Sequence, residues 1–233
     1  MRPLFSTFKL IIFGIWSLIS IILASLLRLV RLQNGMEWVA KHFWPPFVLP
    51  LLQVKLEIEN GDRIDPNESY LIMANHNSFV DIPVLFKTMP FYTYFIAKKE
   101  LKKIPLLGWY IKAYGMIFID RSNRVNAQKS IEEAAILIAN GKHVIIFPEG
   151  TKSKDGKIAK FKKGGFHLAD QAQVPILPIK IEGARNVWPN KKPFQLKKGI
   201  ITVKVGKPIE AESLKDKDIG ERAIFVREVI SSL

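Results

Sequence analysis

The sequence YLIMANHNSFVDIPVLFKTM, residues 70–89, passes from an apolar run through a polar turn into a second apolar stretch. Its first five residues, YLIMA, form a short, nearly continuous apolar run of the kind found in strands that are buried on both faces. Pro83 has no backbone N–H and fits only the first turn of a helix, so the next helix is predicted to begin between Phe79 and Ile82. This stretch therefore predicts a buried strand followed by a helix, and so an α/β fold.

The same alternation of apolar runs and amphipathic segments continues along the chain from residue 54. Further strands are predicted at VKLEIE (54–59), TYFIAKK (93–99), GMIFIDR (115–121), VIIFPEG (144–150), PILPIKI (175–181) and ITVKVGKPI (201–209). Apolar residues at helical spacing predict a helix from about 126 to 140, ending at Asn140-Gly141. Residues 54–233 are therefore predicted to form one α/β domain with a central, mostly parallel sheet flanked by helices.

The first 53 residues have a different pattern. Leu10 to Leu27 is a run of 18 residues without a charge, with basic residues on both sides. A helix of this length is about 27 Å long, close to the minimum needed to cross a bilayer. Asn34-Gly35 is the predicted stop of this helix, and residues 38–52 are again apolar and aromatic but interrupted by three prolines. Residues 1–53 are therefore predicted to form a membrane-anchoring helical segment.

Three arrangements of this segment remain open. It forms one spanning helix with an interfacial continuation, a helical hairpin held in a single leaflet, or two buried core helices of a soluble protein. The basic residues on both sides of the apolar run favour the hairpin.

The composition limits the chemistry and the partners. The formal charge is +14, from 35 basic and 21 acidic residues, which favours anionic partners such as phospholipid headgroups, acidic carriers or nucleic acid. No nucleic-acid-binding module is recognisable, and the apolar N-terminal segment also argues against that class. The chain contains no cysteine, so disulfides, thiolate metal sites and cysteine nucleophiles are excluded.

One histidine and one aspartate are placed where a catalytic pair can form. His76 follows the predicted strand at its C-terminal end, where the sites of open α/β sheets gather, and Asp81 lies at the entrance of the next helix. An aspartate there can accept from one imidazole nitrogen and leave the other free as a general base. The alternative is a helix-capping aspartate beside an unrelated surface histidine.

A second candidate site follows the strand at residues 144–147. The loop from Lys152 to Lys163 carries six lysines and a single acidic residue, Asp155, and such a density of ammonium groups suits a phosphate-bearing ligand. Arg121, at the end of another predicted strand, could contact the same ligand. The glycine and Ser/Thr positions do not match a Walker A loop. The alternative is a solvated basic loop that contacts anionic lipid.

Four blocks together resemble the glycerolipid acyltransferase family in order and spacing, within about residues 70–210. They are Asn75-His76 with Asp81, GMIFIDR at 115–121, FPEGTKS at 147–153 and VPILPI at 174–179. One position departs from the family, because the third block usually reads FPEGTRS and Lys152 stands in place of the arginine. Charge is retained, but the bidentate geometry of a guanidinium is lost.

The resemblance implies an enzyme that acylates the free hydroxyl of 1-acylglycerol 3-phosphate, also called lysophosphatidic acid, to give phosphatidic acid. His76 would be the general base and Asp81 would orient and polarise it. Substrate-binding positions implied by the family are Arg121, Glu149, Gly150, Thr151 and Lys152. The donor would be acyl-CoA or acyl carrier protein, with no cofactor and no metal required.

The implied partners are membrane phospholipid and lysophosphatidic acid, and the donor pool implies the cytoplasmic face of a membrane. Two alternatives remain open at this stage. One is an acyltransferase of the same fold that acts on another lysophospholipid, on glycerol 3-phosphate or on a lipid A-type acceptor. The other is a non-catalytic protein that binds anionic lipid through the helix and the lysine-rich loop.

Overall fold

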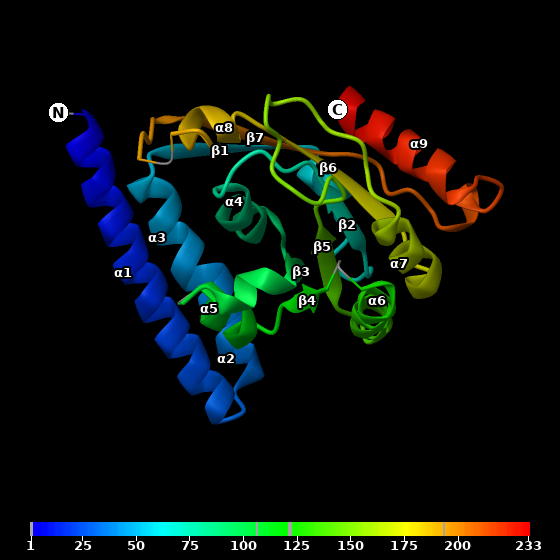
Figure 1. The fold of residues 1–233 in the computed structure, drawn as a ribbon, viewed down its shortest axis with the longest axis horizontal. Helices are drawn as coiled ribbons and strands as arrows, with labels where there is room; N and C mark the ends of the chain where they lie inside the picture. Colours follow the sequence, from blue (N-terminus) through cyan, green and yellow to red (C-terminus); the bar gives the residue numbers. More distant parts are fainter. Residues whose placement is uncertain (1, 106, 121–122, 193) are drawn as a thin grey trace.

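The computed structural model describes residues 2–105, 107–120, 123–192 and 194–233. It contains a seven-stranded sheet in the order β1-β7-β6-β2-β5-β3-β4 (Figure 1). The strands are β1 (Val54–Glu59), β2 (Leu71–Ala74), β3 (Thr93–Lys98), β4 (Ile117–Ile119), β5 (His143–Ile146), β6 (Ile176–Glu182) and β7 (Gly199–Val205).

The predicted fold class is confirmed. Each neighbouring pair of strands is parallel except β6 and β7, which are antiparallel. β2 and β5 lie next to each other, with Met73 opposite Ile146, and all four residues of each strand are buried. Because both strands are covered on both faces, their sequences are apolar without alternation. The two loops that carry the predicted site residues leave the same edge of the sheet.

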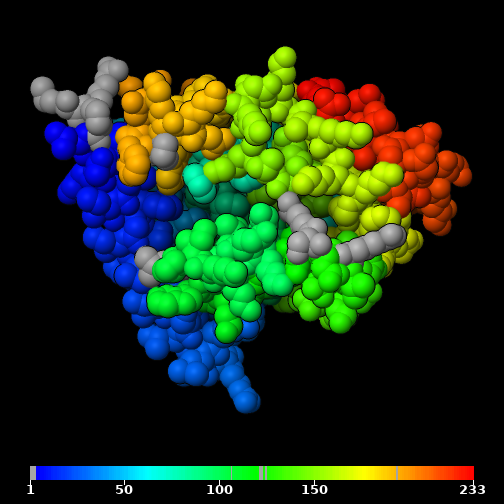
Figure 2. Space-filling view, in the orientation of Figure 1, coloured from blue at the N-terminus to red at the C-terminus, as the bar shows by residue number. Residues whose placement is uncertain are grey.

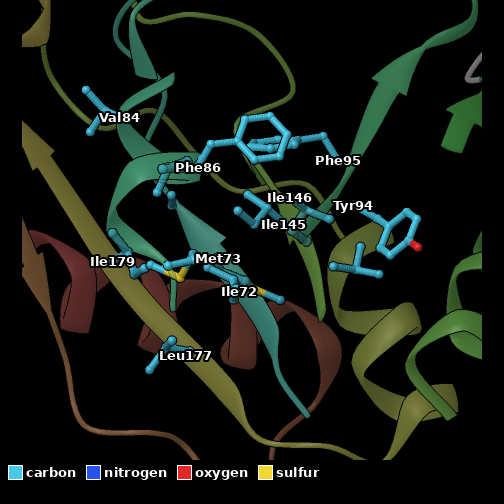
Figure 3. Packing of buried hydrophobic residues seen from close by; sticks show 14 of the residues in the cluster. Ile72, Met73, Val84, Phe86, Tyr94, Phe95, Ile145, Ile146, Leu177 and Ile179 are labelled. Atoms are coloured by element: carbon cyan, nitrogen blue, oxygen red, sulfur yellow. The ribbon is translucent and has the colours of Figure 1, made fainter. Parts of the chain in front are cut away.

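Helices cover both faces of this sheet. They are α4 (Asp81–Thr88), α5 (Leu107–Ala113), α6 (Arg124–Ala139), α7 (Gly164–Ala172), α8 (Ala184–Val187) and α9 (Ile219–Ser232), with 3-10 turns η2 (Gly61–Arg63), η3 (Lys99–Lys103) and η4 (Glu212–Leu214). Figure 1 shows α4 on one side of the sheet and α6, α7 and α9 on the other. In Figure 3, Phe86 of α4 lies beside Phe95 of β3, and their ring centroids are 5.2 Å apart.

The N-terminal segment forms a helical hairpin. α1 (Arg2–Leu29) is followed by α2 (Gln33–Trp38), the π-helix η1 (Val39–Phe43) and α3 (Trp44–Leu51), which run back along α1 (Figure 1). The predicted helix stop at Asn34-Gly35 is wrong, because the turn lies earlier, at Arg31 with φ of 59°, and both residues belong to α2. A Cβ on Gly35 would lie 3.2 Å from a methyl carbon of Leu27, so this glycine serves the close approach of α2 to α1.

The prolines do not interrupt the helical path of residues 33–51 either. Pro45 and Pro46 occupy the first turn of α3, where a missing N–H costs no hydrogen bond, and Pro50 lies in its last turn. The predicted boundary at residues 53 and 54 falls between α3 and β1. The hydrophobic core is continuous across that boundary and includes Ile21 of α1 together with Leu71 of β2.

One side of α1 packs on the core and the other is exposed and apolar. Phe13 and Trp16 pack against the core, and Ile21 and Ala24 are buried. The exposed stripe comprises Leu4, Phe5, Phe8, Ile11, Ile15, Ile19, Ile22, Leu26 and Leu29. Within the described part of the chain, this is the single helix long and apolar enough to cross a membrane, and 17% of its most apolar window is buried. The reading of α1 as a buried core helix is therefore wrong.

Candidate active site

The candidate site lies where β2 and β5 end. His76 follows β2 by two residues, and Asp81 is the first residue of α4, within the range predicted from Pro83. The two side chains are in contact, with 2.8 Å between His76 Nδ1 and Asp81 Oδ2. The predicted pair therefore forms in the folded chain.

Asp81 accepts several hydrogen bonds from the preceding turn and does not act as the N-cap of α4. The N-cap position of α4 is Val80, which makes no side-chain cap. The backbone N–H groups of Asn77 and Ser78 donate to Asp81 Oδ2 at 2.7 and 2.8 Å, in addition to the histidine. The side chain is fully buried in the first turn of α4. Asp81 is thus a fixed acceptor for the imidazole ring.

The His76 ring is held from two directions. It stacks on the Phe147 ring, with centroids 4.0 Å apart and an interplanar angle of 16°. Because Asp81 accepts at Nδ1, the neutral ring carries its hydrogen there, and Nε2 is left as a proton acceptor. The side chain keeps 17% of its surface exposed, so the ring remains accessible to a substrate.

Glu149 fixes the backbone around His76. Its two carboxylate oxygens accept from the backbone N–H groups of His76 and Ala159, both at 2.8 Å, and the residue is 3% exposed. Burial raises the pKa of Glu149, while these two N–H groups act in the opposite direction. Ser153 N donates to the His76 carbonyl at 2.8 Å, which adds a backbone link between the two loops. These contacts support a positioning role for Glu149, and its predicted direct contact with substrate stays a prediction.

The remaining predicted residues lie along the loop after β5. Gly150 has φ of 75°, a left-handed conformation that favours glycine, and Thr151 is exposed. Lys152 is half-buried, and its ammonium nitrogen lies 2.9 Å from the centroid of the Phe79 ring. Burial lowers the pKa of Lys152 to about 8, against an opposing effect of the Asp81 carboxylate. Arg121 lies outside the described residues.

The connection between β6 and β7 supplies contacts that the sequence analysis missed. Asn190 Nδ2 donates to the carbonyl of Asn77 at 2.8 Å and to that of Ser153 at 3.2 Å, so it joins the loop after β2 to the loop after β5. Ser78 Oγ donates to the Trp188 carbonyl at 2.8 Å. Asn77 and Ser78 are 113 and 110 residues before their partners in sequence, and Ser153 is 37 residues before Asn190, and no motif or spacing marks these contacts.

Asn75 links the end of β2 to the neighbouring strand β6. Its side chain donates to the Ile181 carbonyl at 3.0 Å and accepts from the Ile181 N–H at 2.6 Å, which ties the end of β2 to β6. This residue belongs to the first sequence block, and the structure gives it a bridging role between strands. The residue before the histidine is therefore part of the support for the dyad.

Figure 2 shows a hollow on this face of the molecule, with α4 at its bottom. The blue α1 lies on its left and the yellow-green loop after β5 on its right, so α1 and the lysine-rich loop are on opposite sides of the hollow (Figure 2). Among the residues the structure describes, no group of three or more His, Asp or Glu side chains is placed to hold a metal ion. The groups that the site offers for chemistry are the His76 imidazole as a general base, the Asp81 carboxyl group beside it and the nearby Lys152 ammonium group.

The chain was compared with known proteins. The model of the acyltransferase family matches residues 55–182. The 1-acyl-sn-glycerol-3-phosphate acyltransferase of Saccharomyces cerevisiae is 35% identical over 214 residues, which cover 89% of this chain and 69% of the yeast protein. The 1-acyl-sn-glycerol-3-phosphate acyltransferase alpha of Ovis aries is 31% identical over 94% of this chain and 77% of its own length.

A solved structure is also similar over nearly the whole chain. It is the crystal structure of the 1-acyl-sn-glycerophosphate (LPA) acyltransferase PlsC from Thermotoga maritima, with a TM-score of 0.81 and 27% sequence identity. The match covers 99% of this chain and 94% of that protein. The likeness therefore includes the N-terminal hairpin as well as the α/β domain.

Proposed function

Because the chain belongs to the acyltransferase family, we propose that it transfers a fatty acyl group from an acyl thioester to the free hydroxyl of 1-acylglycerol 3-phosphate. The products are phosphatidic acid and the free thiol of the donor, which is coenzyme A or acyl carrier protein. The observation that carries this proposal is the contact between His76 and Asp81 at the end of β2. The names of the similar proteins support the choice of acceptor.

The reaction proceeds by direct attack, without an acyl-enzyme. His76 Nε2 removes the proton from the acceptor hydroxyl as its oxygen bonds to the thioester carbonyl carbon. The tetrahedral intermediate then breaks its carbon–sulfur bond, and the departing thiolate sulfur takes this proton from the imidazolium to give the free thiol. The carboxylate of the buried Asp81, beside Nδ1, stabilises the positive ring between these two proton transfers.

The acceptor phosphate is bound by the loop after β5. Lys152 supplies a positive charge beside the dyad, and the resemblance adds Arg121, Gly150 and Thr151 to the binding set. Glu149 acts through the His76 backbone, because both of its oxygens already accept backbone N–H groups. Holding the phosphate here brings the acceptor hydroxyl and His76 together in one orientation.

Residues 1–53 anchor the protein at a membrane, where the acceptor is found. The exposed apolar stripe of α1 supports this role, and α2, η1 and α3 return the chain to the side from which α1 started (Figure 1). The thioester donors are cytoplasmic, which places the hollow at the cytoplasmic face.

The test is acyl transfer by the purified protein in detergent micelles. Lysophosphatidic acid, other lysophospholipids and glycerol 3-phosphate are each supplied with both donor types, and products are identified by mass spectrometry. We expect phosphatidic acid, at least a thousandfold less of it from His76→Ala, and unchanged vesicle binding by that variant. The matched control is His167→Ala, because His167 is an exposed histidine on α7.

Acylation of a different acceptor only would refute the assignment of lysophosphatidic acid. No acylation of any acceptor, with vesicle binding intact, would instead favour the non-catalytic lipid-binding protein.

A further inference from the structure

We propose that Phe79 is a positioning residue that holds the Lys152 ammonium group beside the dyad, so that Lys152 can bind the acceptor phosphate. This inference rests on the proposed function. It names a residue to which the reaction scheme gives no role.

The contact between the two side chains is close. Lys152 Nζ lies 2.9 Å from the Phe79 ring centroid, compared with 4.7 Å for Lys9 over Phe5 and 5.8 Å for Lys217 over Phe225. A cation over an aromatic face is attracted by the ring quadrupole, and more strongly when the ammonium has lost part of its water. Lys152 is half-buried, so it meets this condition.

Phe79 is itself supported from behind. Its ring lies against Trp188, with centroids 5.6 Å apart, and Trp188 packs edge-on against Phe13 of α1 at 5.4 Å. Trp188 is 7% exposed, and its carbonyl accepts the Ser78 hydroxyl. Phe79 remains 51% exposed although both Trp188 and Lys152 contact its ring.

The position of Phe79 in the sequence ties the lysine to the catalytic pair. Phe79 lies between His76 and Asp81, in the short turn whose backbone N–H groups donate to the Asp81 carboxylate. That carboxylate also acts electrostatically on Lys152. The contact with Phe79 therefore fixes the position of Lys152, and of a phosphate bound to it, relative to the dyad. The connection is the six-residue turn from His76 to Asp81, in addition to the long lysine-rich loop.

The physical need for such a support follows from the lysine side chain. Lysine has four rotatable bonds and a point charge, whereas the arginine fork is planar and loses less freedom for each hydrogen bond formed. The ring restrains the lysine before the ligand arrives, which reduces the entropy lost on binding. An ammonium group has three N–H donors, so contact with the ring on one side leaves donors for phosphate oxygens.

The kinetic test measures KM for lysophosphatidic acid and kcat at saturating donor, with the full chain in micelles. Phe79→Leu is expected to raise KM about tenfold and change kcat less than twofold, and Phe79→Tyr is expected to retain the wild-type KM. The control is Phe225→Leu, which removes a ring on α9 that lies beside Lys217. Thermal unfolding of each variant establishes that it is folded.

Coupling between the two residues separates positioning from a general structural role. Lys152→Met should raise KM, and Phe79→Leu should add less than twofold to it in that background. Lys152→Arg should restore a near-wild-type KM in the Phe79→Leu chain, because the guanidinium does not need the ring. Independent, multiplicative effects, a fall confined to kcat, or no rescue by arginine would each overturn the proposal.

A spectroscopic measurement does not depend on the reaction. With carbon-13-labelled lysine, the ε-CH₂ resonance of Lys152 should be shifted upfield by the Phe79 ring current, and Phe79→Leu should abolish that shift. A wild-type resonance without the shift overturns the proposal, whatever the activity. A wild-type chain that shows the shift but acylates no phosphate-bearing acceptor refutes the proposed function and, with it, the role assigned to Phe79.

Discussion

Replacing Asp81 by asparagine tests the proposed role of the dyad most directly. Asp81 Oδ2 accepts from His76 Nδ1 and from two backbone N–H groups, and an asparagine amide oxygen at this position can still accept from the imidazole. Asp81→Asn therefore removes the negative charge with little change in shape. The charge matters when His76 carries the proton of the acceptor hydroxyl.

The size of the effect follows from the geometry. Unit charges about 4 Å apart interact by about 4 kcal/mol at an effective dielectric constant of about 20. The Asp81 carboxylate is fully buried, so the interaction is not screened by water. Losing it raises the barrier by about the same amount, which corresponds to roughly a thousandfold lower rate. Because the imidazolium exists only along the reaction path, the loss should fall on kcat, with KM little changed.

The assay is steady-state acyl transfer at varied lysophosphatidic acid and saturating thioester. Asp62→Asn is the matched control, since Asp62 is exposed and lies in η2. The midpoint of thermal unfolding is measured for both variants, to separate loss of chemistry from loss of structure. A rise in KM with kcat intact would refute the reasoning, because Asp81 would then act in substrate binding alone.

Two further predictions concern pH. A bound phosphate raises the pKa of Lys152 above its free value of about 8, so acceptor binding is full below pH 8 and weakens as the pH rises beyond it. KM for lysophosphatidic acid should accordingly rise above pH 8 in the wild type, and an equal rise in Lys152→Arg would contradict this cause. Burial, with a smaller effect of Lys142, lowers the pKa of His143 from 6.5 to about 4. As the pH falls, His143 therefore takes up a proton in the unfolded chain before it does so in the folded chain. This difference should lower the free energy of unfolding by about 2 kcal/mol at pH 5 relative to pH 7.5. Urea unfolding at both pH values should show a smaller acid loss in His143→Gln, and an identical loss would refute it.

The parts of the fold that could be predicted are those encoded by local pattern. Continuous apolar runs identified β2 and β5 because both strands are buried on both faces. Pro83 located the start of α4 because a missing N–H is tolerated only in the first turn. That start brought Asp81 within reach of His76, although spacing alone did not distinguish a dyad from a helix cap.

What could not be predicted depends on contacts across the chain or on packing. Asn190 was missed because a loop amide has no periodic pattern, and its partners precede it by up to 113 residues. The predicted helix stop at Asn34-Gly35 was wrong because the sequence does not distinguish a glycine that permits close helix packing from a glycine that ends a helix. The positioning contacts of Glu149 with the backbone N–H groups of His76 and Ala159 are visible only in the coordinates, and its substrate contact, implied by the resemblance, stays a prediction.

The packing of α1 ties the proposed membrane anchor to the site geometrically. Its exposed stripe faces away from the core, while Phe13 on its other side contacts Trp188, which supports Phe79. A bilayer that takes up the stripe would therefore hold the hollow at a fixed height through direct side-chain contacts, with no flexible linker between them. In the proposed reaction the acceptor enters from the lipid and its phosphate reaches Lys152, so a fixed height would favour acceptors whose free hydroxyl lies a short, constant distance from the headgroup phosphate. In 1-acylglycerol 3-phosphate the two groups are on adjacent carbons of one glycerol.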